Sequence, residues 1–387
     1  MKNYLFITVL MLSLIFPDGI IETNNTFYSE SLNETRNYTV YLPENYYDSE
    51  NDYPVVYFLH GFGGNNNSYN AMHSSLNNMM GNEIIDMIVV SADGSTDVYD
   101  GSFYTNSILN GDYENYIAYD LVSHIDANYR TKPAKEYRAL SGHSMGGYGA
   151  FRLGLYHSEI FQSLAAHSGP IHLESLNNPF LINAILIEAF FGPLEPDNGS
   201  ITLMMFGLSS AFSPNMDNPP WYVDLPMDSS GNVDWDVFEI WQAHDPFLLI
   251  DEHIETLSMQ NIYFDCGNQD ELQLAPHSED VHNKLIDYNI PHTYQTYSGS
   301  HSGQIYSRLE ISFQFHSDYF ESIDPIILGD VNSDGEINVL DVVQSINYIL
   351  SNDNPSEEQI AAADLNEDGI LNVLDIVLLV NIILGRI

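Results

Sequence analysis

The chain has 387 residues, of which 44% are hydrophobic, and this length can hold a full α/β core and a second module. Its 54 acidic residues far outnumber its 10 lysines and arginines, so the formal net charge at pH 7 is -44. A phosphate backbone or an anionic membrane surface would repel such a chain, which argues against a nucleic-acid partner.

The N-terminus has the pattern of a signal peptide. A lysine at position 2 precedes an apolar run over residues 4–16, and Pro17, Asp18 and Gly19 follow it. The run is too short to span a bilayer comfortably, and no later segment reaches transmembrane length, so we expect no membrane insertion. We therefore predict a signal peptide over residues 1–22 and a secreted, extracellular product.

Residues 23–324 alternate between strand-like and helix-like patterns, which predicts an α/β domain with a mostly parallel central sheet. Apolar strands that run into glycine-rich loops support this interpretation. The helices are expected where apolar residues recur at a spacing of 3.6. Strands are expected at 36–43, 53–59, 87–94, 163–168, 261–267 and 292–297, and helices at 116–129 and from about 305 to 320.

A strand-like run breaks at a serine flanked by glycines and resumes as a helix. The pattern is Gly142-x-Ser144-x-Gly146, in which small residues permit the strained turn of a nucleophile elbow. We predict that Ser144 is the catalytic nucleophile. The backbone N–H groups of Met145 and of Phe62, which lies in a glycine-rich loop upstream, are expected to form the oxyanion hole.

The strand and helix patterns lapse between residues 173 and 245 into prolines, asparagines and scattered aromatic residues. Loops of this length usually act as lids or binding surfaces, so we interpret the segment as a lid-like insertion over the site. An ordinary helical excursion that packs on the sheet is the alternative, and the sequence leaves both open.

An activated serine needs a base within hydrogen-bond reach. His301 lies in a loop of small residues between the last expected strand and the last expected helix of this domain, which is where the fold carries its catalytic histidine. We predict His301 as the base. His143, inside the elbow, and His60, at the start of the upstream glycine-rich loop, are expected to have structural, hydrogen-bonding roles.

The base needs an acid to orient it. Asp270 follows the strand at 261–267 through a short turn, which places its carboxylate at the carboxyl end of that strand, and we predict it as the acid. Asp265 lies too early, within the strand. Glu271 is the main rival, and Asp280 is a further candidate if the turn is longer. Asp270 has an alternative role as a turn residue that caps the next helix.

A motif at residues 330–341 recurs at 364–375, so the C-terminal region is an internal duplication. Oxygen side chains stand at loop positions one, three, five, nine and twelve, glycine stands at six, and position seven offers a backbone carbonyl, as in EF-hand calcium loops. We predict two structural Ca²⁺ sites, with two metal-free acidic turns as the alternative. The predicted ligands are Asp330, Asn332, Asp334, Glu336 and Asp341 in the first loop and Asp364, Asn366, Asp368, Ile370 and Asp375 in the second.

Residues 27–322 resemble the putative esterase family of the α/β-hydrolases, which includes esterase D, feruloyl esterases and antigen 85-type acyltransferases. The resemblance implies an α/β-hydrolase fold and a carboxylic ester hydrolase that needs no cofactor for catalysis. It rests on the segments 36–43, 60–64, 92–94, 142–147, 265–270 and 299–303.

Residues 329–387 resemble a type I dockerin, whose paired calcium loops and helices bind cohesin modules. The resemblance implies a small all-α domain over 325–387 and a cohesin-type protein partner. The positions that often select the cohesin are Val339-Leu340 and Val373-Leu374, identical in both copies, which predicts binding in two orientations. The sequence leaves open whether this apolar surface meets a partner, meets the esterase domain or belongs to a calcium-stiffened terminus.

We therefore interpret the chain as a secreted serine carboxylesterase that acts on feruloyl or acetyl esters of polysaccharide. The expected export and the dockerin-like terminus motivate the substrate, because the elbow itself names neither the acyl group nor the alcohol. An acyltransferase of the antigen 85 type and a non-catalytic, calcium-dependent scaffold or binding protein are the alternatives. A glutathione-thioester hydrolase fits the signal-like leader less well.

Overall fold

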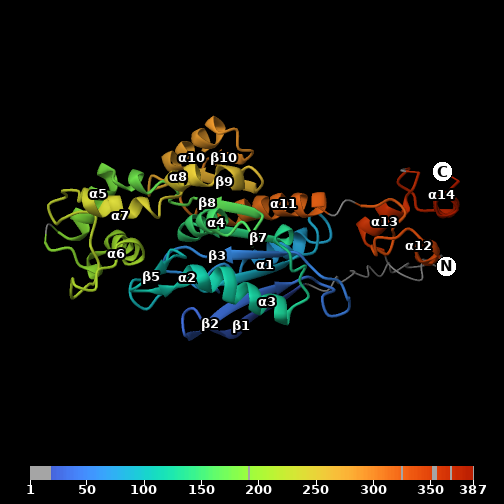
Figure 1. Cartoon of the computed structure of the whole chain (residues 1–387), viewed down its shortest axis with the longest axis horizontal. Coiled ribbons are helices and arrows are strands. Elements are labelled where there is room, and N and C mark those ends of the chain that lie inside the picture. The colour runs from blue at the N-terminus through green and yellow to red at the C-terminus, as the bar shows by residue number, and fades with distance from the viewer. Residues whose placement is uncertain (1–18, 191, 324–325, 351–354, 367, 387) are drawn as a thin grey trace, which may run out of the picture.

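The computed structural model describes residues 19–190, 192–323, 326–350, 355–366 and 368–386 (Figure 1). The expected signal peptide falls almost entirely on residues 1–18, outside the described residues. Residues 20–22, at the end of the predicted signal peptide, belong to the first strand. The leader and its cleavage point therefore stay predictions.

An eight-stranded sheet lies at the centre of the larger domain, in the order β1-β2-β4-β3-β7-β8-β9-β10. β1 pairs antiparallel with β2 and β2 antiparallel with β4, and every pair from β4 to β10 is parallel, so the predicted mostly parallel sheet is confirmed. The strands are β1 (Ile20–Ser29), β2 (Glu34–Leu42), β3 (Val55–Leu59), β4 (Ile88–Ala92), β7 (Arg138–His143), β8 (Ser163–His167), β9 (Asn261–Gly267) and β10 (Thr293–Tyr297), and a separate small sheet pairs β5 (Asn106–Ser107) with β6 (Gly111–Asp112).

Each of the six expected strands is present, with ends that differ from the prediction by at most two residues. β1 was not predicted. Its sequence carries Glu22, Asn24 and Asn25 in the middle, so it lacks the apolar run of the central strands, and pairing with β2 along one edge of the sheet forms it instead.

Helices cover both faces of the sheet, and β3 shows why. Its five side chains are all fully buried, and they alternate between two cores, as the period of two in a strand requires. Val55, Tyr57 and Leu59 face the core under α3 (Val122–Asn128), α4 (Met145–Tyr156) and α10 (Ala275–Asp287). Val56 and Phe58 face the core under α1 (Met72–Met79) and α11 (Ile305–Ile323).

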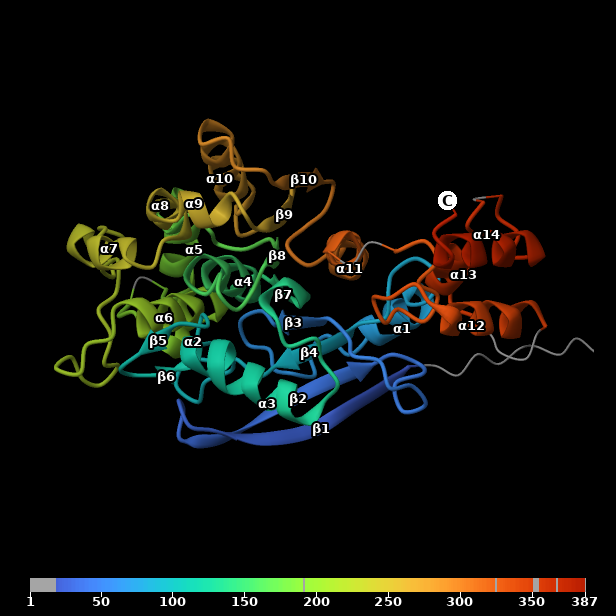
Figure 2. The same ribbon diagram turned by 45° about the vertical axis from the view of Figure 1, so that its right-hand side comes forward.

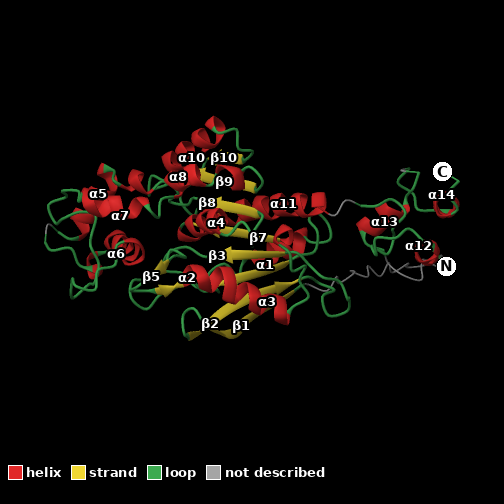
Figure 3. Cartoon of the chain, viewed as in Figure 1, coloured by secondary structure: helices red, strands yellow, loops and turns green. Residues whose placement is uncertain are grey.

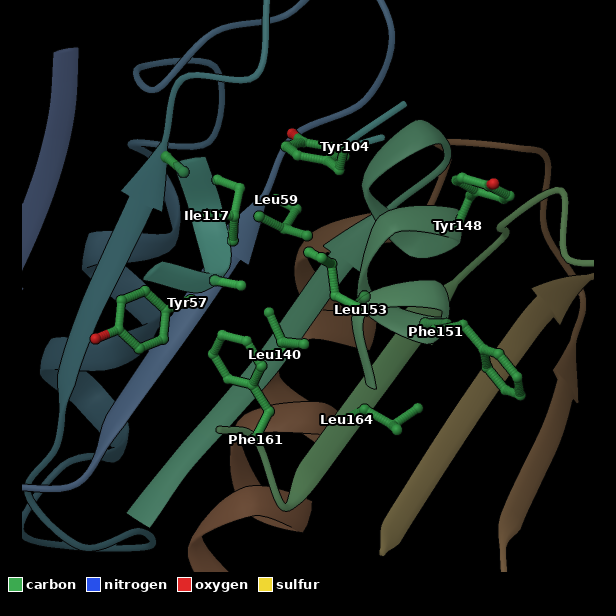
Figure 4. Packing of buried hydrophobic residues seen from close by; sticks show 14 of the residues in the cluster. Tyr57, Leu59, Tyr104, Ile117, Leu140, Tyr148, Phe151, Leu153, Phe161 and Leu164 are labelled. Atoms are coloured by element: carbon green, nitrogen blue, oxygen red, sulfur yellow. The ribbon is translucent and has the colours of Figure 1, made fainter. Parts of the chain in front are cut away.

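Figure 4 shows the first of these cores at close range. Leu140 of β7 and Leu164 of β8 lie on the sheet beneath Phe151 and Leu153 of α4, and all four side chains are fully buried. This packing fixes the axis of α4 and therefore the position of the turn at its first residue.

The two expected helices are present. The first is a continuous helical segment made of α2 (Tyr113–Asn115), a π-helical stretch (Tyr116–Leu121) and α3, and the second is α11. Outside the segment 173–245, this domain also contains α8 (Pro246–Leu249) and α9 (Ile254–Leu257), with short 3₁₀ turns at Lys135–Tyr137 and Ile250–Glu252.

The segment over residues 173–245 is partly helical, and turns and extended stretches such as residues 213–234 join its helices. It contains 3₁₀ turns at Leu173–Leu176 and Pro196–Asn198 and the helices α5 (Pro179–Glu188), α6 (Ser200–Phe212) and α7 (Trp235–Gln242). Figure 1 shows these helices gathered beyond the carboxyl ends of the parallel strands. They enclose a small core of their own, in which Ile185, Met205, Phe206, Val223 and Met227 are buried.

The C-terminal domain is all-helical, as predicted, with α12 (Val339–Ile349), α13 (Glu357–Ala363) and α14 (Val373–Ile383) (Figure 3). Val331, Tyr348, Ala363 and Leu379 form its core. In Figures 1 and 2 it lies at the end of the molecule away from α5, α6 and α7. No helix in the described part of the chain is long and apolar enough to cross a membrane.

Candidate active site

Ser144 stands between the last residue of β7 and the first residue of α4, with a φ of 58°. Its N–H donates to the carbonyl of His167 at 2.8 Å, which holds the turn against β8. The flanking positions have no room for a side chain larger than that of glycine. A Cβ added to Gly142 would lie 2.1 Å from the carbonyl oxygen of Gly146, and a Cβ added to Gly146 would lie 1.9 Å from the carbonyl oxygen of Leu59. The strand, the strained serine and the helix together have the geometry of a nucleophile elbow.

Ser144, His301 and Asp270 form a chain of two side-chain contacts. His301 Nε2 is 2.8 Å from Ser144 Oγ, and His301 Nδ1 is 2.8 Å from Asp270 Oδ2. Since an ionised carboxylate only accepts, Nδ1 carries the proton and Nε2 is free to accept one from the serine hydroxyl. The structure thus brings the predicted nucleophile, base and acid together.

Asp270 is 3% exposed and accepts further hydrogen bonds from Leu272 N–H at 2.8 Å and from the thiol of Cys266 at 3.5 Å. Burial alone would raise the pKa of its carboxyl, but the hydrogen bonds and the charge of His301 outweigh burial and lower that pKa. The carboxylate is therefore ionised at neutral pH and holds the imidazole in one tautomer.

The rival acids lie elsewhere. Glu271 touches His301 only at the backbone, where its carboxylate accepts the His301 N–H at 2.9 Å. Asp280 binds His172 Nδ1 at 2.7 Å. Asp265 is fully buried inside β9 and pairs with Arg308 at 2.8 Å, so its place in the strand does turn it away from the site.

The two other candidate histidines make hydrogen bonds within the scaffold. His143 lies 2.9 Å from the carbonyl of His301 through Nε2 and 2.7 Å from the Tyr69 hydroxyl through Nδ1. Burial lowers the pKa of His143 to about 3, so its ring is neutral and positions the His301 backbone. His60 accepts the N–H of Gly94 at 2.9 Å and lies in the interior.

A cavity opens beside Ser144, and both predicted oxyanion-hole residues, Phe62 and Met145, line it. Met145 is the first residue of α4, where backbone N–H groups have no acceptor within the helix. The Phe62 ring packs closely on Gly207 of α6. A Cβ added to Gly207 would lie only 2.4 Å from the ring. The helical segment 173–245 is therefore in contact with the loop that carries Phe62.

That segment also lines the cavity, which the sequence did not reveal residue by residue. Leu176, Leu181, Met204 and Leu208 come from it, and Leu272 and Leu274 of the loop after the acid complete the lining with them. The segment 173–245 thus contains helices and contributes four side chains to the lining of the cavity beside Ser144.

The predicted calcium ligands lie in two loops of one design. In the first loop, Asp330 accepts the N–H of Gly335 at 2.8 Å, and Asp341 accepts the N–H groups of Val331 and Asn338, each at 2.8 Å. The second loop repeats the pattern with Asp364 and Asp375. Gly335 and Gly369 have φ values of 84° and 78°, as the sharp turn at position six requires.

The other predicted ligands belong to the same loops. The side chains of Asn332 and Asn366 donate to Asp334 and Asp368, and the backbone carbonyls of Glu336 and Ile370 accept the side-chain amides of Asn338 and Asn372. Oxygen donors of this kind suit Ca²⁺. In the residues described, however, no group of three or more His, Cys, Asp or Glu side chains is close enough to hold a metal ion.

Comparison with known families divides the chain in the same way as the fold. The family model described as "Putative esterase" matches residues 29–308, and the model of the dockerin type I domain matches residues 328–384.

Two curated relatives resemble part of the chain. An esterase of Mycobacterium tuberculosis is 30% identical over 138 residues, which cover 35% of this chain and 29% of that protein. An endo-1,4-beta-xylanase/feruloyl esterase of Xylanibacter ruminicola is 31% identical over 173 residues, which cover 42% of this chain and 23% of that protein. The chain spans less than a third of the length of each relative.

Solved structures share the fold of the larger domain. A ferulic acid esterase superposes with a TM-score of 0.57 at 20% identity, covering 78% of this chain and 99% of that one. The fluorophosphonate-binding serine hydrolase FphF of Staphylococcus aureus superposes with a TM-score of 0.53 at 16% identity, covering 78% and 98%. The predicted α/β-hydrolase fold is thereby confirmed.

Proposed function

Because the chain belongs to the putative esterase family and ends in a dockerin type I domain, we propose that it is a serine carboxylesterase that works through Ser144, His301 and Asp270. The observation that carries the proposal is the unbroken pair of 2.8 Å contacts from Ser144 Oγ to His301 Nε2 and from His301 Nδ1 to Asp270. A strained serine with a positioned base and a buried carboxylate is the arrangement that activates a hydroxyl.

In the first half of the reaction, Ser144 Oγ attacks the ester carbonyl and its proton passes to His301 Nε2. Asp270 stabilises the imidazolium, as the direct hydrogen bond between them allows. The tetrahedral oxyanion takes hydrogen bonds from the backbone N–H groups of Met145 and Phe62. His301 then gives the proton to the leaving alcohol as the ester C–O bond breaks, which leaves an acyl group on Ser144.

In the second half, a water molecule takes the place of the alcohol. His301 accepts a proton from the water while the water oxygen attacks the acyl carbonyl. The bond to Ser144 Oγ then breaks, the serine recovers its proton from His301, and the carboxylic acid leaves. An acceptor alcohol in place of water would make the same site an acyltransferase.

The substrate we propose is a feruloyl or acetyl ester attached to polysaccharide. Two findings support it: the family match, and a dockerin domain joined to an esterase domain in one chain. The relative in Xylanibacter ruminicola, whose name joins a xylanase and a feruloyl esterase, points to the same kind of substrate. The apolar cavity beside Ser144 suits the ring of a feruloyl group.

The remaining parts of the proposal concern the C-terminal domain. Dockerin type I domains bind calcium, and we assign one ion to each of the loops 330–341 and 364–375 as a structural component. The proposed partner is a cohesin-type module outside the cell. The residues expected to select the cohesin support this partner, because they are apolar and exposed and such surfaces often mark protein interaction sites. Val339 and Val373 are each 65% exposed, and Leu340 and Leu374 are 57% and 58% exposed.

A panel of aryl esters from p-nitrophenyl acetate to methyl ferulate, turned over by wild type and Ser144→Ala side by side, tests the proposal. Ferulate hydrolysis that the substitution abolishes supports a feruloyl esterase, and hydrolysis of short acyl esters alone supports a deacetylase. Product analysis with added alcohol separates hydrolysis from acyl transfer. Absence of serine-dependent turnover would favour the scaffold interpretation.

A further inference from the structure

The side chains that line the cavity beside Ser144 are apolar apart from that of the nucleophile itself. Of the eleven residues that line it, only Ser144 has a polar side chain. The other lining residues are leucine, methionine, phenylalanine and proline. They come from the oxyanion loop, from α4, from the loop after Asp270 and from the helical segment 173–245, together with Phe103 after β4 and Pro170 after β8. A charged or sugar-like acyl group would lose hydrogen bonds to water here without replacing them.

A second cavity lies inside the helical segment, between α5, α6 and α7. It is lined by fourteen residues, including Ile185 of α5, Met205 of α6 and Phe238 of α7. Asn177 is the one amide side chain among them, and the indole N–H of Trp241 already donates to Ser213 Oγ at 2.9 Å. This cavity, which we call the lid cavity, is thus also suited to an apolar occupant.

The two cavities share a wall. Leu176, Leu181, Met204 and Leu208 line both of them, so the lid cavity begins where the cavity beside Ser144 ends. Met204 is the unbranched member of this wall, and a methionine side chain adapts its rotamers to the shape of what packs against it. An acyl group bound at Ser144 therefore has an apolar continuation behind these four side chains.

We propose that the lid cavity receives the distal part of a medium-length aliphatic acyl group, so that esters of such acids are a further substrate class of this site. The proposal rests on the proposed function of Ser144. An aliphatic chain brings no polar group of its own into either cavity, whereas the ring hydroxyl of a feruloyl group would find Asn177 as the one amide side chain in the lid cavity.

The test is the acyl-chain profile of kcat/KM for p-nitrophenyl esters from acetate to decanoate, below their micelle concentrations. Each methylene that enters the lid cavity is expected to raise kcat/KM by up to about fourfold. Ile185 is the residue to change, because it is 6% exposed and lines the lid cavity but not the cavity beside Ser144. Ile185→Phe is expected to lower the decanoate-to-butyrate ratio at least tenfold.

Ile187→Phe is the matched control, since it places the same substitution on the same helix at a side chain that is 69% exposed. It is expected to leave the ratio unchanged. Ile185→Ala, which enlarges the cavity, is expected to move the optimum to a longer chain, and it decides the question if Ile185→Phe does not fold.

A wild-type profile that falls beyond acetate, or folded Ile185 variants with an unchanged profile, would overturn the proposal. These outcomes differ from failure of the proposed function. If the proposed function fails, no ester shows turnover that Ser144→Ala abolishes. If only the present proposal fails, turnover stays serine-dependent, and the preference for longer acyl chains or its dependence on Ile185 is missing.

Discussion

Replacing Asp270 with asparagine tests how the site orients its base. The amide oxygen of Asp270→Asn retains the bond from Leu272 N–H, which the carboxylate accepts at 2.8 Å, so the amide N–H₂ turns toward His301 Nδ1. That hydrogen bond stabilises the wrong tautomer, in which Nε2 carries a proton and cannot accept one from Ser144. The equivalent change in chymotrypsin-like proteases lowers kcat by about 10⁴-fold, or roughly 5 kcal/mol in the barrier.

Glu271→Gln is the control that the chain itself provides. It makes the same carboxylate-to-amide change one residue further on, and the new amide oxygen can still accept the His301 N–H that Glu271 now accepts at 2.9 Å. We expect kcat/KM to stay within about tenfold of wild type, the range for weakening one hydrogen bond to a charged group.

The assay is kcat/KM on the best aryl ester at pH 7.5, with circular dichroism and Tm to show that each variant is folded. We expect Asp270→Asn to keep its fold and lose about four orders of magnitude. Equal losses in the two variants would refute the reasoning, and a larger loss in Glu271→Gln would make Glu271 the orienting acid.

Three further predictions concern packing, pH and calcium. Gly146→Ala is expected to lower both Tm and activity, because its Cβ would lie 1.9 Å from the carbonyl oxygen of Leu59, and a wild-type Tm would contradict this. Burial alone raises the pKa of Asp93, but hydrogen bonds and the nearby Arg36 outweigh it and lower that pKa from 3.8 to about 2. Because the folded pKa lies below the ordinary one, the stabilisation is complete above about pH 4 and is lost as the pH falls toward 2. Asp93→Asn should therefore lower the free energy of unfolding at pH 7 by about 2 kcal/mol and flatten its decline between pH 4 and 2 in chemical denaturation, and an unchanged decline would count against this role. Calcium chelation is expected to lower the melting temperature of the C-terminal domain in calorimetry without changing ester turnover. Asp341→Ala is expected to remove part of the increase in this melting temperature that Ca²⁺ produces. A melting temperature that chelator leaves unchanged would argue for metal-free loops.

The sequence predicted the catalytic elements because each is tied to a strand end. The elbow needs glycines at two positions, and the parallel strands carry Ser144, Asp270 and His301 to the same edge of the sheet. Choosing between Asp270 and Glu271 needed the structure, since the turn after β9, closed by a bond from Asp270 N–H to Gly267 at 3.1 Å, decides which carboxylate points inward.

The structure of the helical segment 173–245 was less predictable for a physical reason. α5 carries apolar side chains on all sides, so its pattern does not tell the buried Leu181 and Ile185 from Phe180 and Ile187, which are 53% and 69% exposed. Only the tertiary packing of α5, α6 and α7 shows which of these residues line the cavity beside Ser144 or the lid cavity. The edge strand β1 was not predicted for a similar reason. It has no apolar pattern of its own, and its pairing with β2 makes it a strand.

The most direct test of the central claim is to find the acyl-enzyme. Wild type is mixed with a p-nitrophenyl ester, quenched in acid within milliseconds and examined by intact-protein and peptide mass spectrometry, with Ser144→Ala in parallel. The proposed mechanism predicts one acyl group per chain, located on Ser144 in the wild type and missing from the variant. Rapid turnover with the acyl group on another residue, or equal turnover by Ser144→Ala, would contradict it.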